Sequence, residues 1–215
     1  MRLRLLIFGR DWLVLMDKVI KGQSLFGMLF QKTYLTLPGA WQRLHDVKRQ
    51  RVFEGEASVR RGRNAFAKGL ATVLRLPPSS DVPIRFVVEP LAGVEAGTGS
   101  RPGGERWQRW FGTFEFTTNL YVHRSFQPEV MDDKTREGSN KVYLEEQFGK
   151  FRFAICLTVK ADEFHWSVTD WWLAGVRLPR WLMPVSQTKE FVDEQGRYRF
   201  DIDLSLPVIG RLIAY

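Results

Sequence analysis

Residues with the chemistry of a metal site or a nucleophile are few and scattered in this chain. The three histidines, His45, His123 and His165, lie far apart, and Cys156 is the single cysteine. Zinc sites place cysteines and histidines at short, regular intervals, and no such spacing occurs here. No Gly-x-Ser-x-Gly turn is present to hold a nucleophilic serine. Cys156 lies within a strand-like segment, so we expect a small buried side chain rather than a nucleophile.

The pair Glu145-Glu146 could supply the two carboxylates that acid–base catalysis needs. Adjacent residues of a strand face opposite sides, however, so these two carboxylates do not converge on one point. We expect one of them to pair with Arg152 or Arg109 on a neighbouring strand. A metal site that combines His165 with either glutamate is a disfavoured alternative. The sequence indicates no particular reaction, so we favour a protein that is not an enzyme and needs no cofactor or metal.

Aromatic residues are abundant, with 8 tryptophans and 16 phenylalanines. So many large rings must be buried or must line a ligand cavity. The inward rings would bound an apolar space, and a few polar groups would orient the head of a ligand. A solidly filled interior is an equally weighted alternative. The residues that we expect to line such a cavity are Trp107, Arg109, Glu146, His165, Trp166 and Trp172.

The formal net charge of +8 is compatible with binding to nucleic acid or to an anionic membrane surface. Acidic residues are interleaved with basic ones, so a merely basic surface is the favoured interpretation. The basic run from Arg60 to Lys68 could hold a phosphate at a helix start, but a solvated turn is the simpler explanation. The segment ERWQRWF mixes arginine with tryptophan as single-strand-binding surfaces do, yet it alternates as a hairpin should. We therefore do not expect nucleic acid as a partner.

The elements that must position these residues are mostly strands. Apolar and polar residues alternate from residue 148 to residue 173, which predicts an antiparallel hairpin with one buried face. Similar runs predict about ten strands, at 51–59, 82–89, 105–111, 113–123, 142–148, 151–160, 163–173, 187–193, 197–206 and 208–215. So many strands with short connections favour a highly curved antiparallel sheet or an incomplete β-barrel.

Two short helices are predicted before the first strand. Ser24 is a candidate N-cap for a helix that runs to about Tyr34. Pro38 suits the first turn of a second helix, which would turn Trp41 and Leu44 inward.

A third helix is predicted between the first two strands. Phe66, Leu70, Val73 and Leu74 have helical spacing, and the pair Pro77-Pro78 ends that helix. The predicted fold class is therefore α+β, in which the N-terminal helices and this helix cover the curved sheet.

Residues 1–22 have a basic start and an apolar run that Arg10 and Asp11 interrupt. The run is too short for a signal-peptide core or a membrane span. We expect a peripheral helical extension that packs on the domain or a partner, or that contacts a membrane surface through residues 1–20. Translation from Met16 instead of Met1 is an open alternative. Residues 23–215 are expected to form one antiparallel β-rich domain in the cytoplasm, with membrane-peripheral attachment as an alternative.

A set of segments carries a family resemblance: SLFGMLFQ, LPGAWQRLHD, FEGEASVRRGR, LPP before VPIRFVVE, GERWQRWFGTFEF, EEQFGKFRFAICLTV, FHWSVTDWWLAGVRLPRWLMP and FDIDLSLPVIGRLIAY. In order and spacing they resemble the bacterial family called domain of unknown function 4166, over about residues 24–215. Members of that family occur alone or fused behind an NAD(P)-binding domain similar to saccharopine dehydrogenases. This chain has no Gly-x-Gly-x-x-Gly after a strand, so it is not the nucleotide-binding part. The resemblance implies no activity and no catalytic residues.

Three functions stay open on this basis. The first is a noncatalytic module that binds a small apolar or amphipathic, lipid-like ligand in a cavity between the curved sheet and the helices. The second is an accessory domain that partners an NAD(P)-dependent oxidoreductase through an exposed apolar patch. The third is an enzyme that uses His165, Glu146 or Arg109. The ligand-binding module is the favoured prediction.

Overall fold

The structure, a computed structural model, describes residues 24–30, 34–35, 37–92, 103–123, 141–160 and 163–215. The predicted N-terminal extension and its membrane contact through residues 1–20 lie outside the described residues. In sequence order the described helices and strands are α2 (Leu25–Phe30), α3 (Gly39–His45), β1 (Arg51–Arg61), α4 (Ala65–Val73), β2 (Ser80–Leu91), β3 (Gly104–Phe111), β4 (Phe114–Val122), β5 (Lys141–Phe148), β6 (Phe151–Lys160), β7 (Glu163–Leu173), β8 (Val176–Arg177), the 3-10 turn η2 (Arg180–Leu182), β9 (Val185–Ser186), β10 (Thr188–Val192), β11 (Tyr198–Asp201), β12 (Asp203–Leu206) and β13 (Gly210–Ala214).

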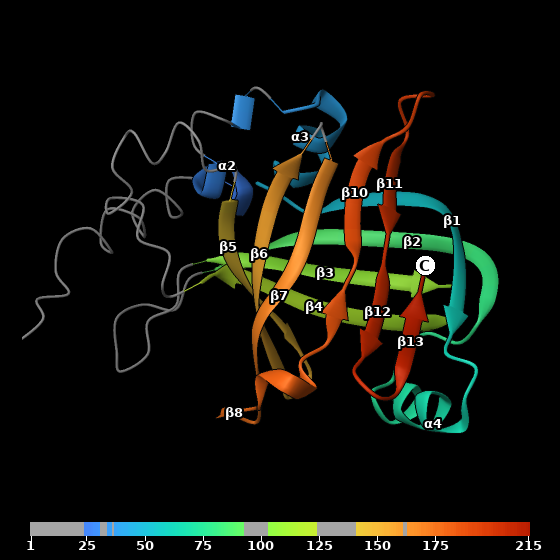
Figure 1. The fold of residues 1–215 in the computed structure, drawn as a ribbon. Coiled ribbons are helices and arrows are strands. Elements are labelled where there is room, and N and C mark those ends of the chain that lie inside the picture. Colours follow the sequence, from blue (N-terminus) through green and yellow to red (C-terminus); the bar gives the residue numbers. More distant parts are fainter. Residues whose placement is uncertain (1–23, 31–33, 36, 93–102, 124–140, 161–162) are drawn as a thin grey trace, which may run out of the picture.

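The strands form one antiparallel sheet that curls strongly around the interior (Figure 1). Its order is β11-β10-β7-β6-β5-β4-β3-β2-β1-β13-β12-β9, and β8 pairs with β7. The two ends of this order are joined by the chain itself, because β9 leads into β10 through Gln187 and β11 leads into β12 through Ile202. Ile202 also exchanges backbone hydrogen bonds with Tyr215 after β13. The predicted curved antiparallel sheet with helices is therefore confirmed. The predicted strand 197–206 appears as β11 and β12, which Ile202 separates, and the short β9 before β10 was not predicted.

Helices α2 and α3 fill one end of the curled sheet (Figure 1). The Gly27 N–H donates to Ser24 Oγ over 3.2 Å, as expected for an N-cap serine. Pro38 is the N-cap residue of α3 and thus precedes its first turn. Trp41 is fully buried and stacks on Phe164 of β7, with ring centroids 3.9 Å apart. An aromatic cluster therefore closes this end of the interior.

Helix α4 lies at the opposite end of the sheet, beside β13 (Figure 1). Asn64 caps it by accepting a hydrogen bond from the Ala67 N–H over 2.7 Å. Ala67 and Ala71 are its buried residues. Of the four apolar residues whose helical spacing predicted this helix, Phe66 and Val73 are exposed. The small alanines allow close packing, so the helix presents them, and not its largest side chains, to the sheet.

A β-bulge in β7 changes which tryptophan faces the interior. Ala154 of β6 pairs with Asp170, and the next residue of β6 pairs with Val168, so Thr169 has no partner in the register. One extra residue reverses the alternation beyond it. Trp171, and not Trp172, therefore continues the inward face of β7.

None of the helices in the described ranges has the length and apolar character needed to cross a bilayer.

Candidate functional site

A cavity of about 350 Å³ lies inside the curled sheet and reaches from the aromatic cluster to α4. Its inner part is formed by deeply buried residues, among them Trp107 of β3 and Trp166 of β7. At the other end its walls include Leu70 of α4 and Leu173 of β7, which are both partly exposed. The cavity is therefore open to solvent at the α4 end and closed at the α3 end.

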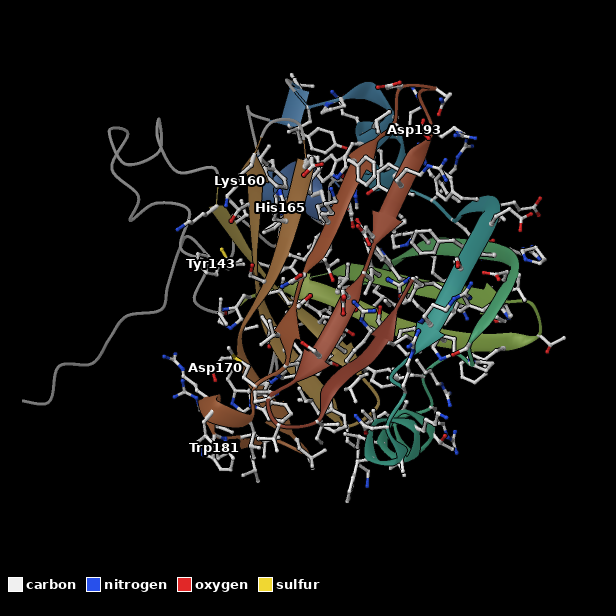
Figure 2. All side chains as sticks on the ribbon, turned by 45° about the vertical axis from the view of Figure 1, so that its right-hand side comes forward. Tyr143, Lys160, His165, Asp170, Trp181 and Asp193 are labelled. Atoms are coloured by element: carbon white, nitrogen blue, oxygen red, sulfur yellow. The ribbon has the colours of Figure 1, made fainter. Side chains whose placement is uncertain are left out.

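Four of the six residues predicted to line a cavity do lie in its wall: Trp107, Arg109, Glu146 and Trp166. They come from β3, β5 and β7, which bring their inward faces together as the sheet curls. The prediction that His165 and Trp172 line the cavity is wrong. His165 alternates with the inward Trp166 and forms an ion pair with Glu163 over 3.3 Å (Figure 2).

Trp172 is turned to the outer face by the bulge at Thr169. The Arg152 guanidinium lies over its ring, 4.4 Å from the centroid. Arg152 also pairs with Glu145 over 3.7 Å. The prediction that one glutamate of the pair Glu145-Glu146 meets an arginine across strands is therefore confirmed, while Glu146 faces the cavity.

Arg109 is the principal polar group of the cavity wall. Its side chain is buried, with 6% of the residue exposed. Three aromatic rings surround its guanidinium, with their centroids 5.1–5.8 Å from Cζ. One hydrogen bond leads from Nη1 to Thr118 Oγ1 over 3.3 Å. No carboxylate of the described residues forms an ion pair with it. Since a guanidinium has five N–H donors, most of them are left for a molecule in the cavity.

Glu146 lies in the same wall. Burial raises the pKa of its carboxyl, whereas the Arg109 charge and the Thr118 hydroxyl lower it and the Glu190 charge raises it further. Burial is the largest of these effects, so the site favours the neutral carboxylic acid more than water does. In its protonated form this carboxyl could donate one hydrogen bond to an anion that Arg109 holds.

The family model described as "Domain of unknown function (DUF4166)" matches residues 37–215.

The chain belongs to this family.

No curated protein and no solved structure matches the chain. The resemblance stated from the sequence is thereby confirmed over most of its expected range. Family membership supplies no site residues.

A second buried polar cluster lies between the cavity and α3. Glu190 Oε2 accepts hydrogen bonds from Trp41 Nε1 over 3.2 Å, from the hydroxyl of Tyr198, and from His45 Nε2 over 3.1 Å. Burial lowers the pKa of His45, against the opposing effect of Glu190. His45 is therefore a neutral donor in this cluster. Glu190 also belongs to the cavity wall, so the cluster connects that wall to the helical end.

This cluster was not foreseen from the sequence. His45 follows Trp41 by four residues, and such residues share one helix face. The inward position of Trp41 thus already indicated that His45 is buried. Glu190 alternates with Lys189 and Phe191 in β10, but the alternation alone does not show that it meets α3.

The buried carboxyl of Glu105 completes the polar groups at this end. Its Oε2 accepts a hydrogen bond from Trp107 Nε1 over 3.0 Å, and its Oε1 has no partner among the described residues. Burial raises its pKa from 4.5 to about 8, with smaller contributions from the negative charges of Glu190 and Asp46. Between these two values the folded protein holds a proton that the unfolded chain does not.

We expect Glu105→Gln to change how stability depends on pH. The contribution of Glu105 to stability is full below pH 4.5 and is lost as the pH rises towards 8, because the folded state binds the extra proton. Glutamine does not titrate, so the variant does not lose stability at this position as the pH rises. Its free energy of unfolding, relative to wild type, should therefore rise from about pH 5 to about pH 8.5 by an amount of the order of a few kcal/mol. Urea unfolding at several pH values measures this difference, and a difference that stays constant with pH would contradict the assignment.

Other catalytic or metal arrangements gain no support from the described residues. The described residues contain no group of three or more histidine, cysteine or acidic side chains that could hold a metal ion. His165 lies on the outer face, away from Glu146 and Arg109, so the enzyme alternative loses its histidine. Cys156 is buried, and its Sγ lies 3.8 Å from Thr158 Oγ1.

Proposed function

We propose that this domain is a noncatalytic module that binds a small amphipathic, lipid-like ligand, with the apolar part in the cavity and an anionic head group at Arg109. The observation that carries the proposal is the buried Arg109 in the wall of an apolar cavity, which has free donors and forms no ion pair with a carboxylate among the described residues. A buried charge without a partner is costly, so its presence calls for a compensating anion. Carboxylates and phosphates are the anions that guanidinium groups bind best.

The rest of the wall suits an apolar tail. Phe116, Phe148, Phe151 and Phe153 line the cavity together with aliphatic residues, and the wall continues to the open end beside α4. The volume of about 350 Å³ is near the lower end of the usual range for small-molecule sites. A single acyl chain or a molecule of similar width therefore fits better than a lipid with two chains.

We also place this binding module in the cytoplasm. The support for this part of the proposal is the single buried cysteine, which suits a reducing compartment.

Native mass spectrometry of freshly purified protein tests the proposal directly. A retained small molecule would identify the ligand class. Delipidated protein should then take up a fluorescent fatty acid with saturation at one molecule per chain. A protein that retains nothing and shows no saturable uptake would contradict the proposal.

We expect Val168→Phe to block this uptake. Val168 lines the cavity, so a larger side chain fills space that the ligand needs, and its added apolar contacts should leave stability unchanged or higher. Ser167→Phe is the matched control, because Ser167 is exposed on the other side of the same strand. Fluorescence titration and thermal unfolding of both variants measure the effect. Equal uptake by both variants would place the ligand elsewhere.

A further inference from the structure

Five large apolar side chains are exposed at the open end of the cavity, and we call them the mouth rim. Phe66 and Val73 of α4 are 81% and 79% exposed. Val176 of β8 is 67% exposed, Trp181 of η2 is 70% exposed, and Val208 between β12 and β13 is fully exposed. Isolated exposed apolar residues are common, but several around one opening indicate an interaction surface.

The segments that carry the mouth rim lie at the same end of the molecule. Asn64 Nδ2, at the start of α4, donates a hydrogen bond to the Ile209 carbonyl in the β12–β13 turn over 2.8 Å. On the other side of the opening the Ala174 N–H, before β8, donates to the Lys150 carbonyl over 2.9 Å. Leu70 of α4 and Leu178 before η2 both line the cavity. Figure 1 shows α4 and β8 at this end, and Figure 2 shows Trp181 there.

The charge of this end is entirely positive in the three connecting segments. Residues 62–79, 174–187 and 206–210 contain no aspartate or glutamate. Arg63, Lys68 and Arg75 are exposed, and none of them forms an ion pair with a described residue. Lys150 and Arg180 add to this charge, although Arg180 lies 3.6 Å from Asp170 at the edge of the rim.

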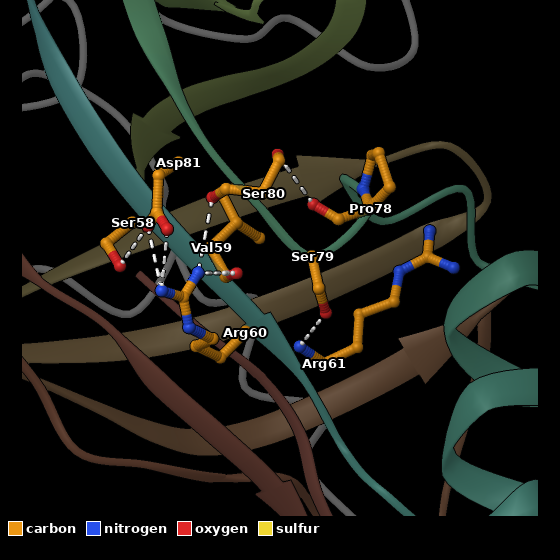
Figure 3. Close-up of polar contacts among 8 residues, drawn as sticks. All are labelled: Ser58, Val59, Arg60, Arg61, Pro78, Ser79, Ser80 and Asp81. Carbon is orange, nitrogen blue, oxygen red and sulfur yellow. Dashed lines mark hydrogen bonds and ion pairs between the residues drawn. The ribbon is translucent and has the colours of Figure 1, made fainter.

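Two further arginines nearby, Arg60 and Arg61, are already used by the fold, and Figure 3 shows the contacts of the Arg60 side chain and of the Arg61 backbone. Arg60 pairs with Asp81 over 2.8 Å. The side chain of Arg61 donates to the carbonyls of Pro77 and Leu76, and its backbone N–H donates to Ser79 Oγ. The exposed cations that form no ion pair with a described residue are therefore Arg63 before α4, Lys68 on α4 and Arg75 after it, beside the exposed apolar side chains.

The backbone of Val208 also points to a role outside folding. Its φ angle is +69°, a region that β-branched residues rarely adopt. Glycine or asparagine would suit this turn position better. The fully exposed apolar side chain gains no contact that offsets the strain within the described part of the chain.

We propose that the mouth rim docks on an anionic lipid bilayer, with the open end of the cavity against the membrane. Apolar side chains at loop and helix tips enter the boundary between head groups and acyl chains, and the surrounding cations are attracted to anionic lipids. This arrangement places the cavity opening next to the acyl chains. A single-chain amphipathic molecule could then pass between bilayer and cavity without crossing water. A protein partner on the same surface would need acidic residues to match the cations, and it is the alternative that the experiment must separate.

This proposal goes beyond ligand binding, and the two can be tested apart. Vesicle binding is measured without added ligand, and ligand binding is measured with a fluorescent fatty acid in solution without vesicles. Loss of either property alone therefore identifies which proposal fails.

The test is co-sedimentation of the full chain with vesicles of phosphatidylcholine alone and of a three-to-one mixture of phosphatidylcholine and phosphatidylserine. One variant combines Phe66→Ser, Val73→Ser and Trp181→Ser, and a second combines Arg63→Glu and Lys68→Glu. Their matched controls are Leu35→Ser and Lys160→Glu, exposed positions that belong to the α2–α3 segment and to the last residue of β6. Because all these side chains are exposed, thermal unfolding should be unchanged.

We expect wild type to bind the mixed vesicles, to bind phosphatidylcholine weakly, and to lose binding at high salt. Each rim variant should bind the mixed vesicles at least about 10-fold more weakly than wild type. The two controls should bind like wild type. The proposal is overturned if wild type ignores both kinds of vesicle, or if the rim variants bind as well as their controls. The second outcome would assign any vesicle binding to another surface. If the triple serine variant no longer unfolds cooperatively, the charge-reversed variant decides the test in its place.

Discussion

Replacing Arg109 by methionine is expected to weaken the binding of a fluorescent fatty acid by about 10- to 100-fold. The same change is expected to raise the free energy of unfolding of the ligand-free protein by about 1 kcal/mol or more. These two effects have opposite directions, and together they would show that Arg109 serves a ligand and not the fold.

The loss of affinity follows from the hydrogen bonds of a guanidinium to an anion, which are among the strongest in proteins. The gain in stability follows from burial. Arg109 is 6% exposed, has one hydrogen bond to Thr118, and has no carboxylate partner among the described residues. The rings of Trp107, Phe86 and Phe116 offset only part of the cost of removing this charge from water. Methionine fills similar space without a charge.

Two controls make this prediction specific. Arg85→Met changes an exposed arginine on the neighbouring strand that lies over the outer Trp110, and it should affect neither property. A fluorescent fatty alcohol of the same chain length should bind wild type and Arg109→Met with similar affinity, because it has no anionic head. If the variant loses the alcohol and the acid equally, Arg109 shapes the cavity instead of recognising a charge.

Glu190→Leu is expected to lower the free energy of unfolding by about 3–5 kcal/mol. The glutamate accepts hydrogen bonds from Trp41, Tyr198 and His45, which are 149, 8 and 145 residues away in sequence. Leucine would leave three buried donors without an acceptor, and each such donor costs about 1–3 kcal/mol. The variant also avoids the cost of burying a carboxylate, which offsets part of this loss in the free energy of unfolding. The remainder should still make this one of the most destabilising single changes in the domain.

The matched variant is Glu190→Gln, which keeps one side-chain oxygen as an acceptor. It should lose about 1 kcal/mol, because a neutral oxygen accepts weaker hydrogen bonds than a carboxylate. Urea unfolding of both variants measures the difference. The comparison requires that the dependence of the free energy of unfolding on urea concentration has the same slope in both variants. If the leucine variant is as stable as wild type, the desolvation of Glu190 costs as much as the cluster contributes, and α3 is held by aromatic packing alone.

Most of the strand pattern could be read from the sequence because it is local. Alternation of apolar and polar residues depends only on the pleat, so the positions of the strands and the curved antiparallel sheet were predictable. Ser24 as a helix cap could be predicted for the same reason, since a capping side chain reaches a backbone group three residues away.

Local pattern failed where an extra residue or a close approach changed the geometry. The bulge at Thr169 places Trp171 on the inner face, where Trp172 was expected. Nothing in the sequence of β7 marks this bulge. On α4 the alanines pack inward because the chain enters the helix through Gly62, where a Cβ atom would lie 1.9 Å from the Arg211 carbonyl oxygen. Such close packing leaves no room for Phe66 and Val73, and these remain outside.

The sequence by itself indicated most of the strands, the Ser24 cap, the family and four members of the cavity wall, because these follow from residue patterns that are local in the chain. Only the tertiary structure decided that Glu190 of β10 meets His45 of α3, that Arg109 is buried with no ion pair to a described residue, and that apolar side chains gather at one opening. Those features arise when the sheet curls until β9 and β11 continue into β10 and β12. The curl is set by the summed packing of distant strands, and no local spacing of residues carries that information.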